Sequence, residues 1–501
     1  MKHRKILILL VFSLSLLSFG YRQNMASIDF ESREKISLNK SLQYVSQSPI
    51  YISHNDNFST YAISGDGGKN NPWMITGYNI TSNTNILIHI QDTTDYFDIS
   101  GNLLDGIDRT YDGIALSNVV NGSISNNTIR NSYYGIFLNN SVYNIISNNS
   151  VYYNHEDGLY LHDSSNNAII HNLIHNNGQN PGGSGIFLDP SNHNLIINNT
   201  IFNNSKHGIL LNRSDYNIIS SNNVSHNHEH GMFLYYSNYS ILSWNQVHSN
   251  GENPGGSGIF LDPSNHNTIF NNVIFNNNKT GITLNASEYN IVSSNNVSYN
   301  HEDGLFLKDS SFNAISNNLI HNNGVNPGGS GIFLDPSHYN TIDHNSIFSN
   351  GLAAVNISTS SGSNQIVLNN FINNGPGGGE SQAYDDGLDN SFQFNYWNDH
   401  TNTDNNQDGI ADTAYNINGT ANNKDEYPKV NQFVHPTPSP YFITYTTTVT
   451  VPFGETETST TKSTESVSTS SEEPIEGWPL ALVLFSIITL LFLRKFKQRT
   501  H

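Results

Sequence analysis

The chain has 501 residues, a formal net charge of −20 and no cysteine. Without cysteine it has neither a disulfide framework nor thiol-based redox chemistry. Nucleic acid is disfavoured as a partner because phosphates are bound by Lys and Arg, which number only 21 against 41 Asp and Glu. Frequent Asn and Gly set the composition apart from that of an average globular domain and favour a repeat architecture.

The N-terminus has the pattern of a secretory signal. Basic residues within 1–5 precede an almost wholly apolar run, Ile6 to Gly20, and a polar stretch follows. This run is short for a membrane span, so residues 1–26 are predicted to be a signal peptide. A first transmembrane anchor is the alternative interpretation.

The C-terminus has the pattern of a membrane anchor. A second apolar run, Trp478 to Leu493, is followed by the basic cluster Arg494 to Arg499. Basic residues beside a span stay cytoplasmic, so 478–493 is predicted to be a transmembrane helix and 494–501 a cytoplasmic tail, with the body of the protein on the extracellular face. A sorting signal that is cut and replaced by another anchor is the alternative. Residues 435–477, rich in Ser, Thr and Pro, are predicted to form an extended stalk.

Between these ends the sequence repeats itself. Segments that begin Gly-Ile/Leu-x-Leu recur mostly every 23 residues, with a 27-residue unit every third time, so that Gly185, Gly258 and Gly331 are spaced by 73. A period of this length predicts a solenoid. Alternating triplets such as Ile186-Phe187-Leu188, bounded by Asn, Ser and Gly, predict strands.

The predicted fold is therefore all-β, a right-handed parallel β-helix solenoid of about 10–13 turns with three short strands in each turn. In this prediction residues 27–112 form the N-terminal cap and the first irregular turns. Residues 113–375 form the regular repeats, and 376–434 form a C-terminal capping segment with an Asp/Asn-rich loop.

Asn residues recur at fixed places in the repeat, for example Asn194 and Asn199 in one unit and Asn217 and Asn222 in the next. Stacked Asn side chains hydrogen-bond along such a column and satisfy the bent backbone at corners. We therefore assign these columns a structural role. Many Asn also lie in Asn-x-Ser/Thr sequons, and Asn296 is expected to point inward, where it cannot carry a glycan.

The repeat resembles the NosD-like right-handed β-helix family, within the wider group of carbohydrate-binding and sugar-hydrolysing β-helices. The resemblance runs from about Pro49 to Pro428. It implies the fold, and it allows roles that range from sugar chemistry to copper-site maturation. The segments that resemble archaeal surface members are Asn79-Ile-Thr81, Leu103 to Ile107, Asn395-Tyr-Trp397, Asp408 to Asp412 and Asp425 to Pro428.

The outward residue of Gly-Ile-x-Leu is aromatic in most units, which predicts an exposed aromatic strip. Polar residues follow one position after the Leu, so flat rings border hydrogen-bonding groups, as a sugar-binding groove requires. Alternatively, the rings only stabilise a parallel sheet, or a loop covers them. The predicted binding residues are Phe137, Tyr160, Phe187, Phe233, Phe260, Phe306 and Phe333, with Asp189, Asp262 and Asp335 beside them.

The corner that precedes every third glycine contains His and acidic residues, as in Asn154-His-Glu-Asp157 and Asn227-His-Glu-His230. Imidazole and carboxylate together can ligate a transition metal, with His207 of the preceding unit as a further ligand. Solvated polar turns are the alternative. Three Asn-Pro-Gly-Gly-Ser insertions are expected to project beside the Asp189 column or only to widen a corner.

One loop resembles the front of a calcium-binding loop, because oxygen-bearing side chains alternate around a glycine. Tyr415 stands at its twelfth position in place of Glu, so the loop is not a complete EF-hand. Either calcium pins the C-terminal end of the solenoid or the segment is an ordinary Asn/Asp/Gly turn. The predicted ligands are Asp404, Asn406, Asp408, Ile410 and Asp412.

Taken together, the residues favour a non-catalytic surface protein that binds a glycan or a partner surface protein along the aromatic strip. Its acidic residues are spread over equivalent copies, whereas a glycosidase needs two carboxylates at one point. A polysaccharide lyase or glycosidase is the first alternative. A copper-related exported protein is the second, and it rests on the resemblance and on the many His. The expected partners of the favoured, non-catalytic surface protein are a glycan or a surface protein and, through the C-terminal anchor, the membrane.

Overall fold

The computed structural model of the chain describes residues 44–179, 182–252, 255–324, 328–375, 382–400, 403–433, 449–450 and 456–457. The chain divides into two compact units, Leu42–Pro440 and a second unit of Met1–Ser41 with Tyr441–His501. In the second unit the structure describes only β46 (Val449–Thr450) and β47 (Thr456–Glu457), which pair antiparallel.

Several predicted segments lie outside the described residues. These are the signal peptide, the transmembrane helix, the basic tail and all of the stalk except β46 and β47. Within the part of the chain that the structure does describe, no helix has both the length and the apolar character needed to cross a membrane.

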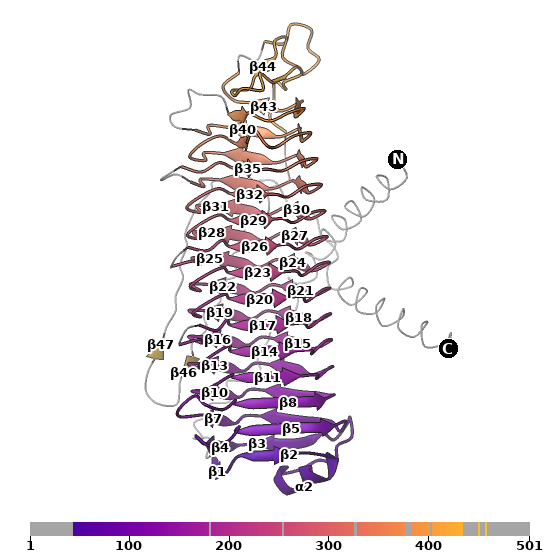
Figure 1. Ribbon diagram of the computed structural model, residues 1–501, viewed down its shortest axis with the longest axis vertical. Helices are drawn as coiled ribbons and strands as arrows, with labels where there is room; N and C mark the ends of the chain where they lie inside the picture. The colour runs from indigo at the N-terminus through magenta and orange to yellow at the C-terminus, as the bar shows by residue number, and fades with distance from the viewer. Residues whose placement is uncertain are drawn as a thin grey trace, which may run out of the picture. The chain divides into compact units, whose positions relative to one another are not determined.

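The larger unit is a solenoid in which each turn gives one strand to each of three sheets, here called A, B and C (Figure 1). Neighbouring strands are parallel from β1 through β43, as the prediction required. Sheet B has fourteen strands and therefore thirteen complete turns from its first strand to its last. The predicted parallel β-helix of 10–13 turns with three strands per turn is confirmed.

Sheet A contains fifteen strands, most of them three residues long. They are β1 (Val45–Gln47), β4 (Tyr78–Thr81), β7 (Leu103–Asp105), β10 (Thr128–Arg130), β13 (Ser150–Tyr152), β16 (Leu173–His175), β19 (Thr200–Phe202), β22 (Asn223–Ser225), β25 (Gln246–His248), β28 (Val273–Phe275), β31 (Asn296–Ser298), β34 (Leu319–His321), β37 (Ser346–Phe348), β40 (Asn370–Ile372) and β43 (Tyr396–Trp397).

Sheet B carries the Gly-Ile-x-Leu motifs. Its strands are β2 (Ile50–Ile52), β5 (Ile88–Thr93), β8 (Ile114–Val119), β11 (Ile136–Asn139), β14 (Leu159–His162), β17 (Ile186–Asp189), β20 (Ile209–Asn212), β23 (Met232–Tyr235), β26 (Ile259–Asp262), β29 (Ile282–Asn285), β32 (Leu305–Lys308), β35 (Ile332–Leu334), β38 (Val355–Ile357) and β41 (Ala383–Asp385).

Sheet C completes each turn and ends in an antiparallel pair, β44 with β45. Its strands are β3 (Trp73–Thr76), β6 (Phe97–Ser100), β9 (Gly122–Ser125), β12 (Ile145–Ser147), β15 (Ala168–Ile170), β18 (Leu195–Ile197), β21 (Ile218–Ser220), β24 (Ile241–Ser243), β27 (Thr268–Phe270), β30 (Ile291–Ser293), β33 (Ala314–Ser316), β36 (Thr341–Asp343), β39 (Gln365–Val367), β42 (Ser391–Gln393), β45 (Lys424–Asp425) and β44 (Tyr415–Asn416).

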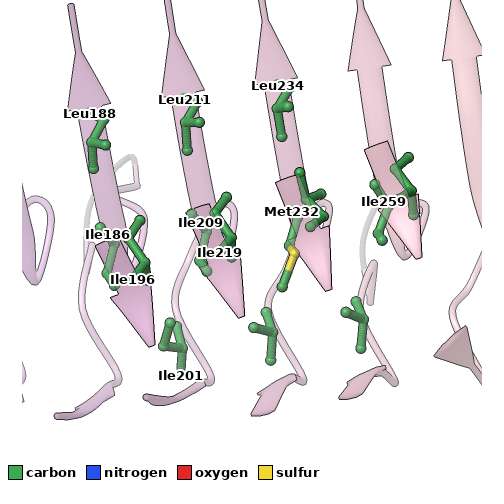
Figure 2. Packing of buried hydrophobic residues seen from close by; sticks show 14 of the residues in the cluster. Ile186, Leu188, Ile196, Ile201, Ile209, Leu211, Ile219, Met232, Leu234 and Ile259 are labelled. Atoms are coloured by element: carbon green, nitrogen blue, oxygen red, sulfur yellow. The ribbon is translucent and has the colours of Figure 1, made fainter. Parts of the chain in front are cut away.

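The core is a column of aliphatic side chains inside the coil (Figure 2). One turn contributes Ile186 and Leu188 from sheet B, Ile196 from sheet C and Ile201 from sheet A, all at 0% exposure. Each such side chain stabilises the fold by about 1.5–3 kcal/mol on burial. A turn buries these residues only against the turns before and after it, so its stability depends on its neighbours.

Buried Asn ladders hold the three corners of each turn. Asn222 shows the pattern. Its amide nitrogen donates to the carbonyl of Ile196 (2.8 Å) and to Oδ1 of Asn245 (3.0 Å), while its own Oδ1 accepts from the main-chain nitrogen of Asn199 (2.9 Å). The structural role predicted for these columns is confirmed. A column of buried Ser residues, including Ser191 and Ser214, adds a fourth ladder after sheet B.

One prediction about these columns is wrong. Asn296 was expected to point inward, but it is the first residue of β31 and is half-buried on the outer face of sheet A. The ladder residue of that turn is Asn295, at 0% exposure. Because side chains alternate between faces, a shift of one residue exchanges the inward and outward positions. Asn296 therefore faces outward, and its orientation does not prevent it from carrying a glycan.

Both ends of the solenoid are covered, as a solenoid requires. At the N-terminal end, η1 (Asn55–Asn57) and α2 (Phe58–Tyr61) place the buried Phe58 against the first turns. At the C-terminal end, Asp425 terminates one Asn ladder. Its carboxylate accepts from the main-chain nitrogen of Asn395 (2.9 Å) and from Nε1 of Trp397 (3.1 Å).

Candidate functional site

The predicted aromatic strip lies on the outer face of sheet B, and strand pairing places its members in one column. Ring centroids are 5.3 Å apart for Phe137 and Tyr160, and 4.9 Å apart for Tyr160 and Phe187. Leu210 and Thr283 occupy the column in two turns. The strip is therefore divided into three groups of rings, and the other two are Phe233 with Phe260, whose planes are tilted by 47°, and the stacked pair Phe306 and Phe333.

The rings of this strip are half-buried rather than freely exposed. Most of them face the next ring in the column, so the surface offered to solvent is largely ring edge. Side chains of the neighbouring corner also pack on them. The His230 ring stacks on Phe260 at 4.6 Å, and the His207 ring meets Phe233 edge-on at 5.1 Å. A ligand would meet these rings mainly at their edges.

The polar column borders the rings at the end of each sheet B strand. Asn212 donates its amide hydrogen to Asp189 (2.9 Å), and Asn285 donates in the same way to Asp262 (2.7 Å). In the third copy the hydroxyl of Ser360 donates to Asp335 (3.2 Å). The structure therefore places Asp189, Asp262 and Asp335 in equivalent, half-buried positions, three turns apart.

A second column of polar side chains lies at the start of the sheet B strands. The Asp and His side chains of this column accept a hydrogen bond from a main-chain nitrogen of the next turn, as Asp157 does from Ser184 (2.6 Å) and His230 does from Ser257 (2.9 Å). Burial raises the pKa of Asp157 to about 7, against the opposing effect of the Ser184 N–H. Burial also lowers the pKa of His207 to about 3.

The predicted transition-metal corner is not supported. His207 and His230 stack face to face with centroids 5.4 Å apart, so their nitrogens do not point at a common position. Nδ1 of His207 accepts from the main-chain nitrogen of His230 (3.3 Å), and its Nε2 lies 3.2 Å from the Glu229 carboxylate. Among the described residues, no three His, Cys, Asp or Glu side chains gather as a metal would require.

The described part of the first insertion, Gly182 to Ser184, lies at the other end of β17 from the predicted position. Gly183 packs on the main chain of Glu156 and Asp157, at the corner where sheet A leads into sheet B. Asp189 is the last residue of β17, at the far end of that strand. The expectation that the insertions stand beside the Asp189 column is therefore wrong. Gly185 and the first three residues of β17 separate the two features.

In the predicted calcium loop, the carboxylates accept hydrogen bonds from the loop itself. Asp404 accepts from the main-chain nitrogen of Gly409 (2.9 Å), and Asp408 accepts from that of Ile410 (2.8 Å). Asp412 accepts from the main-chain nitrogen of Asn405 (3.1 Å), and the amide of Asn406 donates to Asp408 (3.0 Å). This is the geometry of consecutive Asx turns. Calcium binding stays a prediction.

Sequence reasoning missed a longer aromatic stack at the corner between sheets B and C, here called the corner stack. Adjacent centroids are 4.9–5.1 Å apart with interplanar angles of at most 11°. The exposed fraction is 44% for Phe312 and 57% for Tyr339. The stack consists of His193, Tyr216, Tyr239, His266, Tyr289, Phe312 and Tyr339.

Every residue of the corner stack has a positive φ between 56° and 60°. This conformation is uncommon for aromatic residues, so the turn itself aligns the rings. A signal was present in the sequence, since each ring stands one residue before a position of the Asn column, as Tyr216 stands before Asn217. Periodicity alone did not reveal it because the residue lies in a turn, where strand alternation does not apply.

A family model described as the right handed beta helix region matches residues 61–218, 175–256, 219–371 and 257–424. No curated protein matches the chain. Among solved structures, the A-module of mannuronan C-5 epimerase AlgE6 from Azotobacter vinelandii is 14% identical, with a TM-score of 0.43, over 68% of this chain and 98% of its own.

The Dettilon tailspike protein is 16% identical over 60% of this chain and 61% of its own, with a TM-score of 0.42. Pectate lyase Pel9A is 14% identical over 55% and 78%, with a TM-score of 0.28. These likenesses concern the fold and carry no information on activity. The family model spans most of the solenoid, and the chain therefore belongs to the right-handed β-helix family.

Proposed function

We propose that this chain is a non-catalytic, surface-anchored β-helix protein that binds an extended glycan along the outer face of sheet B. The observation that carries the proposal is the repeated pair of a carboxylate and an amide beside the ring column, Asp189 with Asn212 and Asp262 with Asn285. Apolar rings that border a few fixed polar groups are the usual composition of a sugar site.

The spacing of these pairs favours a polymer over a small ligand. Turns are separated by about 4.8 Å, so pairs three turns apart lie about 14 Å from each other along the solenoid. The Asp335 position extends the series by a further three turns. A single sugar unit contacts one pair, whereas an extended chain contacts several, and linked contacts raise the overall affinity.

The negative charge of this face restricts the class of glycan that it can bind. The face carries Asp189, Asp262 and Asp335 on a chain of net charge −20. Acidic polysaccharides would bring like charges together at each of these positions, at a cost in affinity. The proposed ligand is therefore a neutral or basic glycan.

A carbohydrate-active enzyme remains the alternative function. Glycosidases hold two carboxylates about 5–9.5 Å apart. The equivalent carboxylates of this column are separated by about 14 Å, which is too far for one cleavage point. A copper-related role, the second alternative, gains no support from His207 and His230, whose Nδ1 atoms accept main-chain hydrogen bonds.

The test is retention on a panel of insoluble neutral and basic polysaccharides, with released sugars measured in the same samples. Asp189→Ala combined with Asp262→Ala and Asp335→Ala is expected to lower retention at least about tenfold, which corresponds to about 1.4 kcal/mol. Ser147→Ala combined with Ser220→Ala and Ser293→Ala, at the same 73-residue spacing on sheet C, is the matched control. Unchanged retention of the Asp variant, or no retention of the parent, would contradict the proposal. Released sugars would favour the enzyme.

The proposal includes export and anchoring, which rest on the apolar and basic segments at the two ends of the sequence. An exposed solenoid behind a Ser/Thr-rich stalk would be released when protease is added to intact cells, because extended chain is cut before ladder-bonded turns. A solenoid that protease reaches only after cell lysis would contradict this placement. The NosD-like and archaeal character suggested by the sequence also belongs to the proposal.

Calcium at the loop around Asp404 and Asp408 is proposed as a structural ligand. A ligand that binds only the folded state stabilises it by about 2.7 kcal/mol at a hundredfold excess over Kd. Calcium should therefore raise the melting temperature of the parent and not that of the Asp404→Ala, Asp408→Ala variant. If calcium leaves the melting temperature of the parent protein unchanged, the site is excluded.

A further inference from the structure

The outer face of sheet C is uncharged over eight consecutive strands, β12 to β33. The nearest charged outward residues of the sheet are Asp98 in β6 and Asp343 in β36. The outward residues of these eight strands are Ile145, Ser147, Ala168, Ile170, Leu195, Ile197, Ile218, Ser220, Ile241, Ser243, Thr268, Phe270, Ile291, Ser293, Ala314 and Ser316.

This face exposes apolar side chains together with the adjoining corner. Ile145 is 49% exposed, Ile241 is 37% exposed and Trp244 is 36% exposed. The corner stack runs along one edge of β18 to β36 and so borders six of these eight strands, and in it Tyr216 is 48% exposed and Tyr239 is 46% exposed. Soluble monomers rarely expose contiguous apolar patches of more than a few hundred Å².

The area is close to what a specific interface needs. Eight strands at about 4.8 Å span about 34 Å, and the width from the corner stack to the third strand residue is about 13 Å, so one copy offers roughly 450 Å². Two such faces together contribute about 900 Å², not counting the extra area of projecting side chains. This value is near the minimum of about 1,000 Å² for a specific interface.

The face is also regular, which suits a symmetric contact. Pairing continues in the same parallel register from β12 to β33, with equivalent residues opposite each other in every pair. The corner stack keeps ring spacings of 4.9–5.1 Å along seven turns. Two identical faces with the same repeat can match side chain by side chain over their whole length.

We propose that the outer face of sheet C, with the corner stack at its edge, binds a second copy of this chain in a two-fold symmetric dimer. Each copy carries a net charge of −20, so two copies repel wherever their acidic faces meet. Sheet C brings them together without any charged outward residue from β12 to β33. An uncharged, apolar partner face is the chemistry that this surface fits.

The absence of cysteine allows a direct test, because a single introduced Cys can form a disulfide only with another chain. Ser147, Ser220 and Ser293 lie on the sheet C face at 73-residue spacing, all half-buried. Each is changed to Cys in the full chain, and the cells that produce it are treated with a mild oxidant. Non-reducing gels then report the yield of disulfide-linked dimer.

Matched controls exist in the same turns. Asn139, Asn212 and Asn285 follow the same 73-residue spacing on sheet B and are equally half-buried. The dimer band is expected to be several-fold stronger for at least one sheet C variant than for its sheet B counterpart. Equal yields in the two series, or stronger dimers from sheet B, would overturn the proposal.

Charge placed on the face supplies an independent check. Ile241→Asp or Thr268→Glu, each combined with Ser220→Cys, should reduce the dimer band several-fold because like charges then face each other across the interface. Persistence of the band in both variants would mean that the contact is elsewhere. A Ser220→Cys chain that stays monomeric while its introduced thiol resists a soluble thiol reagent would show that another segment covers the face, and would equally overturn the proposal.

Discussion

Sheets B and C share every turn of the solenoid, yet their outer faces differ. Sheet B presents the carboxylates Asp189, Asp262 and Asp335, whereas sheet C presents Ile, Ala, Ser and Thr with no charge from β12 to β33. Inside the coil the two sheets are alike, since both bury aliphatic residues such as Leu211 and Ile219 at 0% exposure. Alternation along each strand therefore lets inward residues determine the fold while outward residues differentiate the faces.

The aromatic residues of the two regions differ in the same sense. The rings of sheet B are half-buried, and two of them, Phe233 and Phe260, pack against His207 and His230 and so contribute to the packing of the corner. The rings of the corner stack are exposed, from 44% at Phe312 to 57% at Tyr339. Aromatic residues at a regular spacing thus serve as packing in one place and as accessible surface in another, depending on the conformation of the turn.

The largest expected effect comes from disrupting the Asn ladder at the corner where sheet C leads into sheet A. Asn222→Ala would remove the acceptor of the main-chain N–H of Asn199 and the side-chain donor to the carbonyl of Ile196, while the side-chain amide of Asn199 keeps the Ile169 and Ile197 carbonyls. The loss of a partner by one buried donor and one buried acceptor costs about 2–6 kcal/mol together. The neighbouring Asn223 points outward, and Asn223→Ala should cost no more than about 0.5 kcal/mol. Urea unfolding midpoints measure the difference, and similar losses for the two variants would contradict the assignment of the ladder.

A slightly smaller effect is expected from the core, where neighbouring residues of one strand can be compared. Leu211 is buried and Leu210 is half-buried on the outer face of sheet B. Leu211→Ala should cost about 2–5 kcal/mol. Leu210→Ala should cost no more than about 1 kcal/mol. The pair Ile219 and Ile218 should repeat this contrast on sheet C. If substitution of the outward residue destabilised the protein as much as substitution of its inward neighbour, the claim that inward residues determine the fold would be wrong.

The third prediction concerns the corner that leads into sheet B, where Asp157 should make the free energy of unfolding depend on pH. Burial raises the pKa of Asp157 to about 7, so the folded state retains a proton that the unfolded state has lost above its ordinary pKa of 3.8. The stability contributed by this group is fully present below pH 3.8 and is lost as pH rises toward 7. Asp157→Asn removes this loss, so variant and parent should diverge between pH 4 and pH 8 by about 4 kcal/mol, because a tenfold change in proton affinity corresponds to about 1.4 kcal/mol.

Urea midpoints of both proteins across this range measure the divergence. Glu156 and Lys206 lie near Asp157 and are unchanged in the variant, which keeps their contributions equal. A constant difference between variant and parent from pH 4 to pH 8 would show that Asp157 does not hold a proton in the folded state.

The sequence predicted the fold closely because periodic spacing translates directly into register. Glycines spaced by 23 and 27 residues, with Asn at fixed offsets, are enough to place Ile186, Asn199 and Phe187 inside, at a corner and outside. Turn conformation was not predictable in this way. Positive φ angles in the turns align the corner stack but leave no periodic mark in the sequence. The position of Asn296 was missed for another reason, because an offset of one residue within a strand reverses the orientation of the side chain.

The candidate site was predicted in part for a related reason. Spacing identifies which residues share a column, such as Phe187 and Phe260, but not what packs over them. Contacts between corners, such as His230 on Phe260, depend on the path of the chain between strands. The same limit applies to His207. The sequence suggested it as a metal ligand, but its Nε2 lies beside the Glu229 carboxylate and its ring stacks on that of His230.

The most direct test of the central claim measures both faces in the same two variants. One carries Asp189→Ala, Asp262→Ala and Asp335→Ala on sheet B, and the other carries Ile218→Asp and Ile241→Asp on sheet C. Each is assayed for retention on the glycan that the parent binds and for dimer formation through Ser220→Cys. We expect the sheet B variant to lose retention and keep the dimer, and the sheet C variant to lose the dimer and still bind the glycan. Loss of both properties in either folded variant, or the reverse assignment, would contradict the central claim.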